Sequence, residues 1–316
     1  MRIRTPSGGV GRLPGQPGSI LCRVTRRLAF LVNPTSGRGR LAGSADAVAK
    51  RLATGGYEVT SMTGKDAAES ADLARSAVAE GYDALVVMGG DGMVHLALQA
   101  VVHSATTLGV VATGTGNDVA RALGIAPRKP LASADVVVAG HSRRIDVAQV
   151  GTTYFASVLA AGFDSLVNER ANAMRWPTGQ MRYNLATLAE LRVFRPITYA
   201  LELDGEPLAC EAMLVAVGNC PSYGGGLRMC EGAEIDDGLL DVVIIRPISK
   251  FELLKVYPRL FKGTHVTHPA YEHHRVRTVR VAAEGIIAYA DGERLGPLPS
   301  TVEVVPSGVS VFAPST

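Results

Sequence analysis

The sequence predicts an α/β protein whose N-terminal domain has a parallel sheet and whose C-terminal domain is antiparallel and strand-rich, with inserted helices. Two observations carry this prediction. Up to about residue 144, β-branched runs alternate with stretches of helical periodicity, which is typical of a parallel sheet with right-handed crossovers. Beyond that point, turn signals such as Asp204-Gly205 and Asp291-Gly292 separate short β-branched runs, which is typical of antiparallel strands.

The bulk composition is that of a folded protein with about two domains. The chain has 316 residues, of which 47% are hydrophobic and 19% charged, so global disorder is excluded. A net charge of +3 and an aromatic content of 5% give no sign of nucleic-acid binding. The four cysteines form no Cys-x-x-Cys pair, and no apolar run reaches the ~18 residues of a membrane span. We therefore expect a reduced, cytoplasmic protein without a signal peptide or membrane-spanning segment.

Composition divides the chain into three parts. Residues 1–27 contain six arginines, five glycines and no acidic residue, which predicts a flexible basic tail. Residues 28–144 form the expected parallel α/β domain. Residues 145–316 form the expected strand-rich domain, and whether its last segment returns to the first domain stays open.

The individual elements follow from periodicity and turn residues. From residue 28 to 150 we expect strands at 28–32, 57–62, 83–88, 108–112 and 145–150, and helices at 46–52, 66–80, 93–101, 119–123 and 132–138. In the remainder, strands are expected at 201–203, 213–217, 240–245, 276–281 and 302–305, and helices at 163–174, 180–194 and 250–261. The second helix illustrates the boundaries, because Asp66 lies in its first turn and Gly81 stops it.

Two glycine-rich turns follow neighbouring buried strands. The turn at 89–92 ends the run Leu85–Met88, and the turn at 113–118 ends the next strand; each precedes a helix. Glycines let backbone N–H groups approach an anion, and a helix N-terminus adds roughly half a positive charge. Neither turn is a Walker A loop or fits the dinucleotide fingerprint. Because the carboxyl ends of parallel strands share one edge, the two turns together predict a phosphate site.

Polar side chains at these strand ends have structural roles, and for two of them, Asp91 and Arg38, a binding role is the alternative. Asp91 either caps the helix that follows it or orients Mg²⁺ through water, since hard cations prefer oxygen ligands. Asn117 and Asp118 stand where a helix N-cap is expected. Arg38, after the first strand, is either a surface charge or a charge-assisted donor to a phosphate.

These motifs, in their order along the chain, resemble the diacylglycerol kinase catalytic family. This lipid kinase group includes sphingosine kinases and is distantly related to NAD kinases. The matching segments are 33–37 (NPTSG), 89–92 (GGDG), 114–118 (GTGND) with Arg121, 162–164 (GFD), 223–226 (YGGG), 236–241 (DDGLLD) and 291–293 (DGE). The stretch around 163–182 looks like soluble kinases of the actinobacterial type. The resemblance implies an α/β nucleotide-binding domain followed by a β-sandwich domain, with ATP in the cleft and the lipid entering through the second domain.

Together with the turns, the resemblance assigns candidate roles to particular residues. The candidate ATP-binding residues are Asn33, Arg38, Thr63, Gly89, Gly90, Asp91, Gly92, Met93, Thr115, Asn117 and Asp118. Ser61 is an alternative to Thr63, because the spacing leaves this contact open. The resemblance implies a structural Mg²⁺ site on Asp237 with the backbone carbonyls of Glu234 and Leu239. It implies that Glu293, which from spacing alone is an exposed turn acid, is the general base beside the second catalytic candidate, Asp91.

The implied activity is ATP- and Mg²⁺-dependent phosphorylation of diacylglycerol to phosphatidic acid. A sphingoid base or another long-chain alcohol is an alternative acceptor, whereas the second-domain motifs disfavour NAD. A nucleotide- or lipid-binding regulator without catalysis is a further alternative, because Met93 and His95 depart from the residues that are usual in the family.

The predicted partner is a lipid at a membrane surface. Residues 246–280 contain eight Lys or Arg against two Glu, and the helix at 250–262 places Phe251, Leu254 and Leu260 among basic residues. This helix either packs on the core with a solvated rim or rests on anionic lipid. We therefore expect a peripheral location at the inner membrane face, and a homodimer stays open. Four histidines between 265 and 274 are expected in a surface loop.

Overall fold

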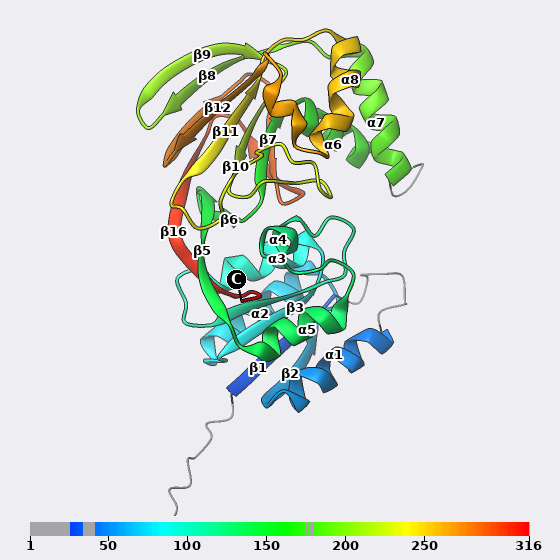
Figure 1. Cartoon of the computed structure of the whole chain (residues 1–316), viewed down its shortest axis with the longest axis vertical. Helices are drawn as coiled ribbons and strands as arrows, with labels where there is room; N and C mark the ends of the chain where they lie inside the picture. The colour runs from blue at the N-terminus through cyan, green and yellow to red at the C-terminus, as the bar shows by residue number, and fades with distance from the viewer. Residues whose placement is uncertain (1–25, 34–41, 175, 177–179, 316) are drawn as a thin grey trace, which may run out of the picture.

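The computed structural model describes residues 26–33, 42–174, 176 and 180–315. Two halves lie one above the other along the longest axis of the molecule (Figure 1). The N-terminal half contains β1 (Arg26–Val32), α1 (Ala42–Thr54), β2 (Tyr57–Thr63), α2 (Ala67–Ala79), β3 (Ala84–Gly89), α3 (Asp91–Val101), β4 (Thr107–Ala112), α4 (Asp118–Ala122) and α5 (Pro130–Ala139). The C-terminal half contains β5 (Ser142–Val150), β6 (Thr153–Phe155), β7 (Val158–Gly162), α6 (Phe163–Ala173), α7 (Gln180–Val193), β8 (Ile197–Leu203), β9 (Glu206–Ala212), β10 (Leu214–Gly218), β11 (Leu240–Ile245), α8 (Lys250–Leu260), a 3₁₀ turn (Thr264–Thr267), β12 (Tyr271–Val276), β13 (Thr278–Ala282), β14 (Ile287–Ala290), β15 (Glu293–Pro297) and β16 (Ser300–Phe312).

The N-terminal half is a parallel sheet covered by helices on both faces. Its strands lie in the order β2-β1-β3-β4, and every residue of β3 is buried, as expected for an apolar strand covered on both sides. Helices α2 and α3 pack on one face, α3 through residues 93–101 at helical spacing, whereas α1 and α5 pack on the other. This arrangement brings the carboxyl ends of β3 and β4 to one edge, where both glycine turns lie.

The parallel sheet continues into the C-terminal half. Strand β16 pairs antiparallel with β13 and β5 and reaches β4 through a parallel contact between Val311 and Leu108. The resulting ten-stranded sheet runs β2-β1-β3-β4-β16-β13-β8-β9, with β5 and β6 attached to β16. The last long strand of the chain therefore lies against the first half, which the sequence had left open.

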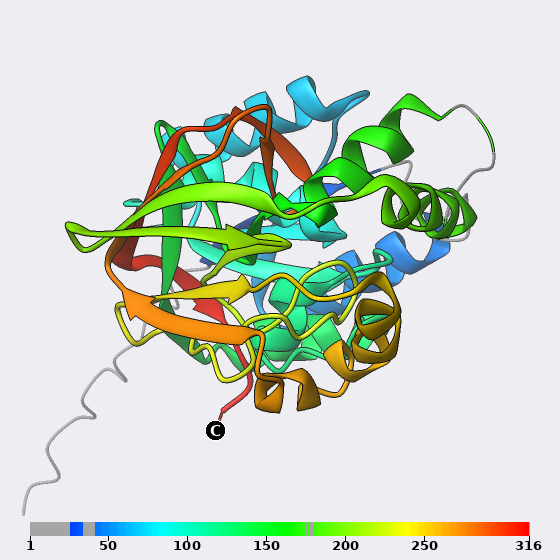
Figure 2. The ribbon, with the colours of Figure 1, turned by 90° about the horizontal axis from the view of Figure 1, so that it is seen from above.

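A second, antiparallel sheet completes the C-terminal half. Its order is β12-β11-β10-β7-β14-β15, and its buried face packs on β8, β9, β13 and β16 of the first sheet around a common apolar core. Figure 2 looks down the longest axis and shows these strands in front of the parallel sheet, with α6 and α7 beside them. The fold class predicted from the sequence, a parallel α/β domain followed by an antiparallel sandwich, is confirmed.

The structure also corrects several expectations. Arg26 and Arg27 begin β1 instead of ending a basic tail; residues 1–25 lie outside the described residues. Residue 144, the predicted domain boundary, lies inside β5. The sequence predicts no strand over β6, β7, β9, β14 or β15. The strand expected at 276–281 divides at Arg277 into the last residue of β12 and most of β13. Within the described ranges, none of the helices has the length and apolar character needed to cross a bilayer.

Candidate active site

The two glycine turns lie directly against each other at the edge of the parallel sheet. The N–H groups of Thr113 and Gly114 donate to the carbonyl oxygen of Gly89, at 2.8 and 3.1 Å. A Cβ added to Gly114 would lie 2.3 Å from the Cα of Gly90, closer than real Cβ contacts. Only glycine permits this approach. The paired turns therefore form one backbone surface next to the start of α3, whose first N–H groups have no partner within the helix.

Asp91, the first residue of α3, binds the second turn through its carboxylate. The N–H of Asn117 donates to Oδ2 (2.6 Å) and the N–H of Asp118 donates to Oδ1 (2.8 Å). Asp91 therefore caps α4, not the helix that follows it in sequence. Burial, and then the charges of Asp118 and Asp291, raise the pKa of Asp91 to about 6. Asp118 and Asp291 thus lie close enough to Asp91 to disfavour its ionisation.

Asn117 fixes the shape of the second turn. Its backbone is left-handed, with φ of 59°, a conformation that asparagine tolerates better than most residues. Its side-chain amide donates to the carbonyl oxygen of Gly114 (2.7 Å) and accepts from the N–H of the same residue (2.9 Å). Asn117 occupies the N-cap position of α4 but makes no side-chain cap bond there. Its role is therefore to hold the glycine turn closed.

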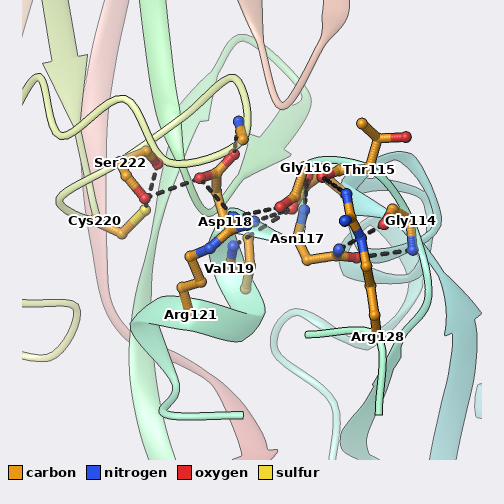
Figure 3. Close-up of polar contacts among 12 residues, drawn as sticks. Gly114, Thr115, Gly116, Asn117, Asp118, Val119, Arg121, Arg128, Cys220 and Ser222 are labelled. Carbon is orange, nitrogen blue, oxygen red and sulfur yellow. Dashed lines mark hydrogen bonds and ion pairs between the residues drawn. The ribbon is translucent and has the colours of Figure 1, made fainter. Parts of the chain in front are cut away.

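Asp118 connects the second turn to the C-terminal half. The Ser222 hydroxyl donates to its Oδ1 (2.9 Å), and the N–H of Gly225 donates to its Oδ2 (2.7 Å). Arg121 bridges Asp118 and the carbonyl oxygen of Gly116 (Figure 3). Since Asp118 is almost fully buried, these bonds satisfy a carboxylate that would otherwise be costly to bury. The same bonds hold the loop at residues 219–226 over the second glycine turn.

The hairpin β14–β15 brings a second set of acids to the same place. Asp291 and Gly292 both have positive φ, 53° and 86°, as a two-residue type I′ turn requires. The buried carboxylate of Asp291 accepts from the N–H of Ala156 (3.2 Å) and from both the N–H (2.9 Å) and the hydroxyl of Ser157. Nδ1 of His95, on α3, lies 3.2 Å from Oδ2 of Asp291. The hairpin is therefore attached to α3 by His95, one of the two residues that depart from the family pattern.

Glu293, the candidate base, follows this turn and faces the first glycine turn. Its Oε1 lies 3.5 Å from the point where a Cβ on Gly92 would stand. The side chain is exposed to a cavity of about 720 Å³ between the two halves. The residues that line this cavity are Asn33, Gly64, Lys65, Asp66, Ala67, Ser70, Gly90, Gly92, Met93, Leu96, Thr113, Gly114, Thr115, Arg128 and Glu293.

This cavity brings together five of the predicted ATP-binding residues, Asn33, Gly90, Gly92, Met93 and Thr115, and two basic residues that the sequence did not suggest. The predicted ATP-binding residues Gly89, Asp91, Asn117 and Asp118 belong to the two turns but do not line the cavity. Gly64 lines it, but neither Thr63 nor Ser61 does, and Arg38 lies outside the described residues.

The two additional residues are Lys65 and Arg128, and Arg128 also donates to the carbonyl oxygen of Thr115 (3.4 Å). Lys65 follows the carboxyl end of β2, and this position was the available signal. Both residues bring positive charge to the predicted phosphate site.

The predicted structural metal site is arranged differently. Asp237 accepts from the N–H of Leu239 (2.9 Å) at Oδ1 and pairs with the guanidinium of Arg275 at Oδ2. In the part of the chain that the structure describes, no group of three or more His, Cys, Asp or Glu side chains is placed to hold a metal ion. A cation on Asp237 and the carbonyls of Glu234 and Leu239 would therefore compete with Arg275, and this ligand set stays a prediction.

Two further motifs meet beside the site. Tyr223, from the predicted YGGG segment, donates its hydroxyl to the carboxylate of Asp164 in the GFD segment, and burial raises the pKa of Asp164 to about 7. The histidines expected in a surface loop are instead structured. His265 is buried, and His273 lies on β12 with its Nε2 2.6 Å from Oδ1 of the buried Asp241.

Comparison with known proteins gives a consistent result along the chain. Residues 27–150 match the family described as the diacylglycerol kinase catalytic domain, and residues 157–313 match the YegS C-terminal NAD kinase beta sandwich-like domain. A protein named diacylglycerol kinase from Mycobacterium tuberculosis is 42% identical over 294 residues, covering 91% of this chain and 95% of its own. One of the same name from Bacillus subtilis is 30% identical over 278 residues, covering 87% of this chain and 92% of its own.

A solved structure supports the fold. The crystal structure of a putative diacylglycerol kinase from Bacillus anthracis superposes with a TM-score of 0.76 at 19% identity, covering 92% of this chain and 97% of that chain. At that level of identity the agreement concerns the arrangement of the two halves and the sheets between them.

Proposed function

The chain belongs to the diacylglycerol kinase family, and from this premise we propose that it transfers the γ-phosphate of ATP to the free hydroxyl of diacylglycerol, giving phosphatidic acid and ADP with Mg²⁺ as the cation. Membership in the family makes the chain a lipid kinase that uses ATP. The observation that carries the proposal is the position of Glu293, which faces the paired glycine turns across one cavity.

In the proposed reaction the chain positions both reactants. Backbone N–H groups of the two turns and the cations of Lys65 and Arg128 hold the phosphates of ATP. The carboxylate of Glu293 accepts the proton of the lipid hydroxyl while the hydroxyl oxygen attacks the γ-phosphorus. The bond from this phosphorus to the bridging oxygen breaks, and ADP leaves.

The acidic residues support the choice of a divalent cation. Asp118 and Asp291 raise the pKa of Asp91, and a divalent cation bound near Asp91 through water and the phosphates of ATP would favour the ionised form of this carboxylate. Carboxylate oxygens and water are the ligands that Mg²⁺ prefers. When bound, Mg²⁺ would neutralise the charge that spreads over the transferring phosphoryl group.

The acceptor defines where the protein works. Diacylglycerol resides in a bilayer, so the proposed activity requires a cytoplasmic chain that reaches the inner membrane face as a peripheral protein. A homodimer is compatible with this proposal but is not part of it.

The decisive experiment follows labelled γ-phosphate from ATP into a panel of lipids in mixed micelles. The panel contains diacylglycerol, monoacylglycerol, ceramide and sphingosine, each with Mg²⁺ present or chelated. We expect label only in phosphatidic acid, and only with Mg²⁺. Label in sphingosine alone would show that the acceptor is a sphingoid base and not diacylglycerol. ATP binding without label in any lipid would favour a regulator without catalysis.

A further inference from the structure

Helix α8 exposes apolar side chains that a core-facing helix would bury. Phe251 is 68% exposed, Leu254 52% and Phe261 48%, whereas Leu260 is 6% exposed. Together with the exposed Pro258, these three residues recur at intervals of three and four, which places them on one face of the helix. The opposite face packs on the core. The sequence had grouped Leu260 with Phe251 and Leu254, but the structure separates them.

Positive charge surrounds this stripe. Lys250, Lys255 and Lys262 are exposed, and the Nζ of Lys255 lies 4.4 Å from the ring centroid of Phe251. The acidic residue of the helix, Glu252, is half-buried, and its Oε1 is bonded to Nε2 of His268 (3.0 Å). Because Nδ1 of His268 accepts from the N–H of Ala270, Nε2 carries the proton and donates to Glu252. The carboxylate of Glu252 is therefore paired with a largely buried histidine.

Helix α7 extends the exposed surface. The Nζ of Lys250 donates to the carbonyl oxygen of Arg192 at the end of α7, and residues of α6, α7 and α8 share one apolar cluster. Val193, beside this junction, is 60% exposed. Figure 1 shows α7 and α8 at the end of the molecule opposite α1 and α5.

We propose that this surface, the docking face, lies on an anionic bilayer. We define it as Phe251, Leu254, Pro258, Lys250 and Lys255 of α8, the two residues that follow the helix, Phe261 and Lys262, and Val193 of α7. The inference rests on the proposed function, which requires a lipid acceptor, and adds which surface meets the membrane. An amphipathic helix with aromatic residues on one face and lysines beside them is typical of a helix that lies in the interface plane.

Charge distinguishes the bilayer from a second copy of the chain. A two-fold interface through α8 would bring the same patch from both copies together, so that lysines would face lysines. An anionic lipid surface instead offers opposite charge to all three lysines, and each contributes about a fivefold increase in binding, corresponding to ~1 kcal/mol. The apolar stripe contributes in proportion to the area it buries among the acyl chains.

The first test measures co-sedimentation with vesicles of phosphatidylcholine and phosphatidylglycerol. The variant F251S/L254S/F261S is expected to bind at least about tenfold more weakly than the parent chain. The matched control is L131S on α5, which removes an equally exposed leucine (49%) at the other end of the molecule and should bind like the parent. Parent-like binding by the triple variant, or no binding by the parent, would overturn the proposal.

The second test separates charge from insertion. K255Q/K262Q should weaken binding to anionic vesicles by more than tenfold but leave binding to pure phosphatidylcholine unchanged, whereas K50Q on α1 should change neither. Position 251 reports insertion, because the chain contains a single tryptophan. In F251W/W176F, brominated lipids should quench the fluorescence, and in L131W/W176F they should not; equal quenching in both would contradict the docking face.

Kinase activity on a short-chain, water-dispersed diacylglycerol separates this inference from the proposed function. The triple variant should phosphorylate this substrate at the parental rate, with an unchanged melting temperature, because the substituted side chains are exposed. If the parent phosphorylates no diacylglycerol but binds vesicles through α8, the proposed acceptor fails and the docking face stands. If the parent phosphorylates diacylglycerol but the α8 substitutions do not change vesicle binding, the proposed function stands and the docking face fails.

Discussion

The close contact between the glycine turns makes Gly114 the most informative residue to change. In G114A the new Cβ would lie 2.3 Å from the Cα of Gly90 and 3.0 Å from its nitrogen. Both neighbours are backbone atoms, so no flexible side chain can move aside. Ordinary contacts begin at 3.4 Å, and the two turns must therefore separate by about 1 Å.

This displacement sets the expected size of the effect. Overpacking of this kind costs about 1–3 kcal/mol of stability. A misplacement of about 1 Å in groups that hold a reactant costs on the order of 100-fold in rate. We therefore expect kcat/KM for ATP to fall about 100-fold, with a protein that still folds.

The assay is steady-state phosphorylation with ATP varied, together with thermal unfolding. G43A is the control, because a Cβ on Gly43 meets nothing within 4 Å; it should retain parental kinetics and stability. G92A is the comparison inside the site, since its Cβ meets only Oε1 of Glu293 at 3.5 Å, so its unfolding should match the parent. If G114A shows parental kcat/KM, the paired turns do not form the ATP site.

Three other predictions concern the acids around these turns. In D118N the free energy of unfolding should fall by about 1–3 kcal/mol, because the new amide faces the N–H of Gly225 or the Ser222 hydroxyl and leaves one donor unpaired. A free energy of unfolding in denaturant equal to that of the parent would contradict this. E293Q should retain ATP binding and lose turnover, whereas E284Q, in an exposed turn, should retain both; near-parental kcat in E293Q would remove Glu293 as the base. The pKa of Asp91 rises from 3.8 to about 6 on folding, so the stability that it contributes is fully present below pH 3.8 and is lost as the pH rises to about 6; D91N should lack this loss in denaturant unfolding between pH 4 and 6, and parallel curves would refute it.

The sequence predicted the local units of the parallel half because their signals are local. An apolar β-branched strand, a glycine turn and a helical stretch follow one another within about twenty residues, and both such units formed where expected. The shared edge of the sheet followed from the parallel order alone. Fold class and the approximate site were therefore accessible.

The partners of the site residues were not accessible, because they lie far away in the chain. Asp91 was expected to cap α3 or hold Mg²⁺ through water, and it bonds to N–H groups 26 and 27 residues later. Asp237 was expected to bind a cation, and it pairs with Arg275, 38 residues away. The general rules for capping and for metal ligands say what an aspartate can bind. They do not say which distant backbone N–H group or charged side chain the fold will bring to it.

The pairing of strands that lie far apart in the sequence could not be predicted for the same reason. Short strands such as β6 and β14 carry too few residues for a periodic pattern, and their existence depends on neighbours that the fold supplies. The exposed face of α8 was equally ambiguous, because apolar residues on a helix predict a core whenever their partners are unknown.

Strand β16 has a consequence for how the cleft closes. Its hydrogen bonds with β5 run without a linker from the sandwich to the parallel sheet, and the register shifts between Val305 and Val309. Movement of the halves toward each other would therefore twist a two-stranded ribbon instead of rotating about a flexible segment, with the irregular stretch as the point of lowest stiffness. A protein built this way resists wide opening, and amide exchange across β5 and β16 would report the strain of closure.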